Sequence, residues 1–109
     1  MGVDHAWEKF SSAIRFVLVS DVSLQERLGV VISDVCLLQR DSFPDERVWE
    51  EFRKLMNETT PRESRQRDEG RIRAAIARMS EEEVKEGLQT AFQIFCHLAK
   101  AIGRTEFAI

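Results

Sequence analysis

The most constraining feature of this sequence is a set of helix-start signals that recur along the chain. Ser23, Thr60 and Ser80 are each followed three residues later by a glutamate. This spacing is typical of a capping box, in which the hydroxyl accepts a hydrogen bond from a first-turn amide and the glutamate reaches back to the capping residue. Asp4 and the Ser42-Phe43-Pro44-Asp45 stretch are looser signals of the same kind. The sequence therefore predicts five helix starts.

The spacing of apolar residues agrees with a helical chain. After each start, apolar residues recur every three or four positions, as in Leu24, Leu28, Val31 and Val35, and no stretch alternates with a period of two. Gly103 follows the last of these residues and predicts the end of the final helix. We therefore expect an all-α fold: residues 1–109 form a single-domain antiparallel bundle of four to five helices.

The polar stretch at about residues 57–70 is the one candidate linker, and two interpretations of it are open. The fourth helix begins at Pro61, directly after the Thr60 cap, and carries a solvated first half. Alternatively, the helix begins nearer Gly70 and the preceding residues are mobile. The capping signal favours the earlier start.

Composition and charge narrow the class of protein. The chain has 109 residues, of which 43% are hydrophobic and 32% charged, which is typical of a globular domain. Its formal net charge of −3 disfavours contact with phosphate backbones and anionic membranes over the surface as a whole. Charged residues interrupt the first twenty positions, so we expect no signal peptide and no membrane span. A cytoplasmic location with two free cysteines, Cys36 and Cys96, is the corresponding expectation.

Several apolar residues lie off the main stripes of the first two helices. Phe16 and Val19 in the first helix, and Val30 and Leu37 in the second, project away from the side that should face the core. One interpretation is that the second helix is central in the bundle and packed on both sides. The other is that these four residues form an exposed patch that a second copy or another protein covers.

Arginines are concentrated in residues 62–78, where six of them accompany three acidic residues. At about 100° per residue, Arg67, Arg71 and Arg78 fall within roughly 40° of one another on a helix. This side is either a solvated surface paired with nearby acids or a contact for a phosphate or an acidic partner. No aromatic residues are interleaved with these arginines, as single-stranded nucleic acid would favour, so nucleic acid is a possible partner but not the favoured one.

The sequence offers little that predicts chemistry. Glycine-rich phosphate loops, nucleophile motifs and metal-ligand spacings are absent, so we expect no catalytic activity, cofactor or metal. The sequence His97-Leu98-Ala99-Lys100-Ala101 resembles the motif of histidine phosphotransfer domains, which are helical bundles of about this length. The resemblance implies an exposed, phosphoryl-accepting His97 on the outer side of the last helix, with Lys100 neutralising the phosphate; Ala101 replaces the glycine usual in that family.

Taken together, these features predict a small cytosolic helical interaction or regulatory module without catalytic activity, which we expect to form a homodimer. Its predicted interface comprises Phe16, Val19, Val30 and Leu37. Binding of nucleic acid or of a phosphate-bearing partner through the arginine-rich helix is the first alternative. Histidine phosphotransfer at His97 is the second.

Overall fold

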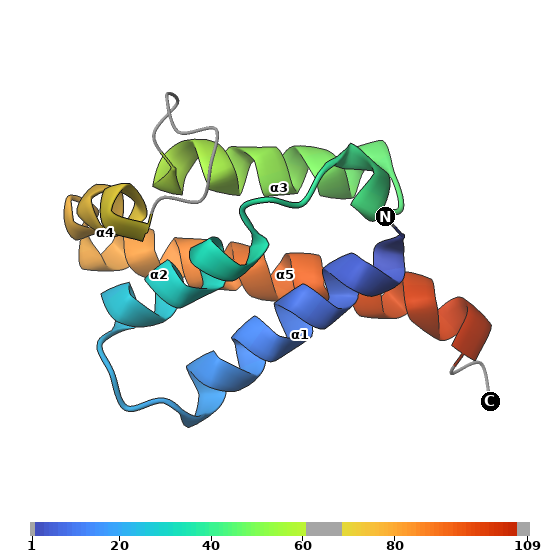
Figure 1. Cartoon of the computed structure of the whole chain (residues 1–109), viewed down its shortest axis with the longest axis horizontal. Helices are drawn as coiled ribbons and strands as arrows, with labels where there is room; N and C mark the ends of the chain where they lie inside the picture. The colour runs from blue at the N-terminus through green and yellow to red at the C-terminus, as the bar shows by residue number, and fades with distance from the viewer. Residues whose placement is uncertain (1, 61–68, 107–109) are drawn as a thin grey trace.

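The computed structural model describes residues 2–60 and 69–106 and shows a helical bundle in that part of the chain (Figure 1). The described residues contain five α-helices, one short 3-10 helix and no strand, which confirms the predicted all-α fold. The elements are α1 (Val3–Val19), α2 (Leu24–Val35), η1 (Arg40–Ser42), α3 (Glu46–Thr59), α4 (Glu69–Ala77) and α5 (Glu81–Glu106).

Two of the predicted capping residues begin helices as expected. The Oγ of Ser23 accepts a hydrogen bond from the amide of Glu26 at 3.1 Å, at the start of α2. At the start of α5, the Oγ of Ser80 accepts from the amide of Glu83 at 3.1 Å, and the Ser80 amide donates to Oε1 of Glu83 at 2.8 Å. The second site is a complete capping box, because Ser80 and Glu83 each accept from the other's backbone amide and so satisfy two of the donors that lack a partner within the helix.

The two looser start signals were placed at the wrong residues. The capping residue of α1 is Gly2, and Asp4 lies in the first helical turn, where a carboxylate interacts favourably with the helix dipole. The capping residue of α3 is Asp45, whose Oδ1 accepts from the amide of Val48 at 3.0 Å. Ser42 instead ends η1 and is buried.

Two helix ends also differ from the sequence prediction. Helix α3 continues through Thr59, and Thr60 is its C-terminal cap, with its amide donating to the Met56 carbonyl at 2.8 Å. The helix start predicted immediately after Thr60 falls on residues 61–68, which lie outside the described part of the chain. Among the described residues, α4 begins at Glu69. The predicted stop at Gly103 is wrong, because α5 continues to Glu106. A glycine inside a helix costs only about 1 kcal/mol relative to alanine, which a helix of this length can absorb.

Helix α5 is the central element of the bundle. It packs against α1, α2 and α3, while α4 packs mainly on α2 (Figure 1). Figure 1 also shows that α1 crosses α5 obliquely and runs in the opposite sense, and Trp7 near the start of α1 stacks on Phe95 in the C-terminal half of α5. Helix α2 is covered by three helices: α1, α4 and α5.

The hydrophobic core draws on all five helices. Phe10 of α1 and Phe43 both contact the ring of Phe52 from α3, with ring centroids 6.3 Å and 4.7 Å apart. The largest fully buried apolar side chains are Phe10, Leu28, Ile32, Leu55, Ile72, Ile76, Ile94, Leu98, Val31, Val35 and Val84. The bundle thus has a complete core of its own before any partner is considered.

Candidate interaction surfaces

The four residues of the predicted interface do not lie in one compact patch. Val19 and Leu37 are exposed, at 84% and 61%, whereas Phe16 and Val30 are half-buried. Val19 is the last residue of α1, directly before the connection to α2, and Leu37 lies just beyond the end of α2. Because α2 has 12 residues, it is about 18 Å long, so Val19 and Leu37 lie near its opposite ends.

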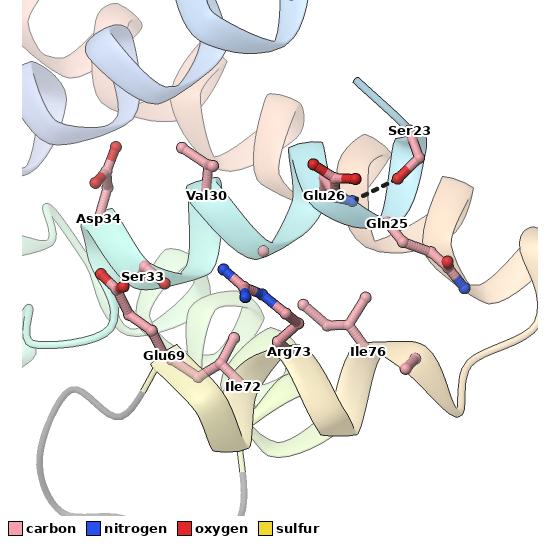
Figure 2. Close-up of a pocket in the computed structure, with 12 residues that line it drawn as sticks. Ser23, Gln25, Glu26, Val30, Ser33, Asp34, Glu69, Ile72, Arg73 and Ile76 are labelled. Carbon is pink, nitrogen blue, oxygen red and sulfur yellow. Dashed lines mark hydrogen bonds between the residues drawn. The ribbon is translucent and has the colours of Figure 1, made fainter. Parts of the chain in front are cut away.

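The position of α2 accounts for part of this pattern. Three helices cover α2, which is the arrangement expected if it is central and packed on more than one side. Val30 lines the edge of a groove between α2 and α4, and Figure 2 shows its side chain directed away from α4. Packing within the subunit therefore accounts for the partial burial of Val30. It does not account for Val19 or Leu37.

The groove between α2 and α4 has a volume of about 280 Å³. Gly29, Ile72 and Ile76 contribute apolar lining, and Figure 2 shows Arg73 reaching from α4 towards α2. Glu26, Asp34 and Glu69 also line the groove, so both signs of charge are present. The volume is at the lower limit for small-molecule pockets, and the mixed charges favour no single ligand class. Sequence analysis missed this groove because it requires α4 to lie beside α2.

A second exposed apolar region lies on the face formed by α1 and α5. Phe92 shares the three-to-four-residue apolar spacing of α5, but its side chain is 52% exposed. Its ring centroid lies 6.3 Å from that of Phe95, which in turn stacks on Trp7 of α1 at 6.4 Å. The three rings form a row that crosses from α1 to α5 and ends in an exposed phenylalanine. We call this row of Trp7, Phe95 and Phe92 the aromatic row.

The predicted arginine cluster is only partly described. Arg67 lies in residues 61–68, outside the described part of the chain. Arg71 is exposed on α4, and Arg78 is exposed in the turn that follows this helix. A contact between this cluster and a phosphate or an acidic partner stays a prediction.

His97 is half-buried, whereas the resemblance to phosphotransfer domains implies an exposed residue on the outer side of the last helix. Helix α3 packs along this side of α5, and Nε2 of His97 lies 3.7 Å from Oε1 of Glu51. The same carboxylate oxygen lies 3.8 Å from Nε of Arg47. A phosphoryl group on Nε2 would therefore face a carboxylate, and the repulsion between like charges disfavours phosphotransfer at this atom.

Neither metal chemistry nor resemblance to other proteins adds a further site. Within residues 2–60 and 69–106, no three His, Cys, Asp or Glu side chains are grouped in a way that could hold a metal ion. The same part of the chain contains no helix with the length and apolar character needed to cross a membrane. Comparison with known proteins finds no matching family model, no matching curated protein and no matching solved structure. The exposed surfaces are therefore the features of this chain that bear on its function.

Proposed function

We propose that this protein is a small helical interaction module that associates with a second copy of itself. The observation that carries the proposal is the exposure, in the described part of the chain, of four large apolar side chains outside a core that draws on all five helices. They are Leu18 at 77%, Val19 at 84%, Leu37 at 61% and Phe92 at 52%. Fully burying a side chain of this kind contributes about 1.5–3 kcal/mol, so covering several of them would offset much of the cost of association.

A second copy is the simplest partner, because in a two-fold dimer the same surface serves both subunits. Cys36 and Cys96 are not joined by a disulfide in the structure. Cysteines outside disulfides are usual in a reducing compartment, which supports a cytoplasmic location for such a module.

Light scattering coupled to size-exclusion chromatography tests the proposal directly. We expect a molar mass of twice the 12.6 kDa of the chain at high concentration, with dissociation on dilution. A mass of one chain at every concentration up to the solubility limit would contradict self-association.

The interface predicted from sequence is tested by Leu37→Glu. If Leu37 lies between two copies, this variant should be helical by circular dichroism but elute as a single chain. Gln39→Glu is a matched control, because it adds the same charge at an exposed position two residues away. Loss of the dimer in both variants would indicate an effect of charge and not of Leu37.

Exposed Arg71 on α4 and exposed Arg78 in the turn after it support the nucleic-acid alternative more weakly, because they belong to a chain of net charge −3. Phosphate contacts made by these side chains would weaken as salt is added. Salt-sensitive binding of an oligonucleotide that falls on Arg71→Ala would favour this alternative. Absence of binding at low salt would exclude it.

A further inference from the structure

The aromatic row ends in a side chain that is exposed to solvent. Trp7 and Phe95 are half-buried and pack against the hydrophobic core, whereas the side chain of Phe92 is 52% exposed. Phe92 contacts Phe95 on one side and is open to solvent on the other. The α1–α5 face therefore carries an aromatic side chain that packing within one subunit does not use.

The charges along α1 beside this row form an ordered pattern. Asp4, Glu8 and Arg15 are exposed, and at about 100° per residue they fall within about 40° of one another on the outer flank of α1. This flank is acidic near the N-terminal end of α1 and basic near its C-terminal end. None of these three side chains makes an ion pair in the described part of the chain.

The outer flank of α5 has the same order of charges along its own direction, acidic near its N-terminal end and basic near its C-terminal end. Glu82, Glu86 and Lys100 are exposed, also fall within about 40° of one another, and make no ion pair with any described residue. Because Trp7 stacks on Phe95 and the two helices run in opposite directions, Lys100 lies at the same end of the face as Asp4. Wherever one flank is acidic, the other flank at the same level is therefore basic.

We propose that two copies of this chain meet through the α1–α5 face, with the two-fold axis running along the seam between these helices. Rotation about this axis places α1 of one copy against α5 of the other. It leaves the position of each residue along the axis unchanged. Asp4 and Glu8 then meet Lys100 of the second copy, Arg15 meets its Glu82 and Glu86, and Phe92 becomes buried. This inference rests on the proposed self-association and names the surface that carries it.

The aromatic part of the proposal is tested by Phe92→Ser. Phe92 is half exposed, so this variant should keep the helical content of the wild type by circular dichroism. We expect it to raise the dissociation constant of the dimer by at least tenfold in analytical ultracentrifugation. An unchanged dissociation constant overturns the proposal.

The charge pattern allows a sharper test by reversal and rescue. Lys100→Glu places three acids together at each symmetric contact and should weaken the dimer by about tenfold at low salt. Combining it with Asp4→Lys and Glu8→Lys should restore association to within about threefold of the wild type. Lys54→Glu is the matched control, because Lys54 is exposed on α3, away from this face, and undergoes the same change of charge. Equal weakening by the Lys54 and Lys100 variants, or absence of rescue, overturns the proposal.

Cys96 supplies an independent readout, because it is exposed one helical turn after Phe92. In the wild type, the rate of Cys96 alkylation should fall as the protein concentration rises and the dimer forms. In Phe92→Ser, the rate should not depend on protein concentration. An equal concentration dependence in both proteins overturns the proposal.

Failure of this inference is distinct from failure of the proposed function. If the wild type is monomeric, both fail. If the wild type is a dimer that Leu37→Glu disrupts and Phe92→Ser leaves intact, self-association stands and the α1–α5 interface is overturned.

Discussion

Helix α2 contacts α5 on one side and α4 on another, and the two contacts differ in how closely the chains approach. At Gly87 of α5, an added Cβ would lie only 3.1 Å from Cδ2 of Leu28. At Gly29 of α2, an added Cβ would lie 4.0 Å from Cδ1 of Ile76, and this side borders the groove. A glycine within a helix thus allows close approach at the α2–α5 contact, and serves no such purpose at the α2–α4 contact.

The tight contact is tested most strongly by Leu28→Ala. Leu28 is fully buried and lies against Gly87, so its truncation removes core packing and leaves a cavity. We expect the free energy of unfolding to fall by about 3 kcal/mol in urea denaturation. Lys54→Ala is the control at an exposed residue of α3, outside both proposed interfaces, and should change it by less than about 0.5 kcal/mol. A loss of under 1 kcal/mol for Leu28→Ala would show that neighbouring groups can move in to fill the cavity, and that the contact is not tight.

Adding a side chain at the tight contact should also destabilise the protein. Gly87→Val places branched carbons where Leu28 already approaches, so overpacking should cost about 2 kcal/mol in chemical denaturation, despite the better helix propensity of valine. The matched variant Gly29→Val places its Cβ at ordinary van der Waals distance from Ile76 and should be close to neutral. Equal effects at the two glycines would remove the distinction between the contacts.

The Ser80–Glu83 capping box at the start of α5 should give the next largest change in the free energy of unfolding. Ser80→Ala removes the acceptor for the Glu83 amide at the start of α5, and should lower the free energy of unfolding by about 1 kcal/mol. Ser80→Asp keeps an acceptor at the same place and should retain most of this stability. Thermal unfolding followed by circular dichroism measures both. Equal losses in the two variants would show that the cap contributes nothing specific.

The smallest effect is expected at the loose contact and has the opposite sign. Gly29→Ala adds a methyl group at ordinary van der Waals distance from Ile76 and should raise the free energy of unfolding by about 0.5–1 kcal/mol. Replicate urea titrations resolve a change of this size. A decrease would mean that α2 and α4 pack as closely as α2 and α5.

Local signals in the sequence predicted the helical class and several boundaries. The caps at Ser23 and Ser80 were found because a capping box depends on residues only three positions apart. The starts at Asp4 and Ser42 were misplaced for a related reason. Several residues in each region are acceptable caps, and Asp45 competes with Ser42 for the same helix. Gly103 failed as a stop because a single glycine does not outweigh a long, well-packed helix.

Features that depend on which helices are neighbours could not be predicted. His97 is half-buried because α3 packs beside it, and Val30 is half-buried because α2 is covered from several sides. Phe92 belongs to the apolar stripe of its helix, but the stripe is wider than the surface that the other helices cover. The two interaction surfaces follow from these neighbours, and helix periodicity alone does not specify them.

The contact between α1 and α5 joins the first helix of the chain to the last. During synthesis, α1 and α2 emerge from the ribosome well before α5, so the side of Trp7 that stacks on Phe95 has no native neighbour until α5 has been made. Contacts between such distant segments slow folding, because a long loop of chain must be closed before they form. The helical pair of α1 and α2 therefore exposes this side of Trp7 to solvent until α5 packs on it.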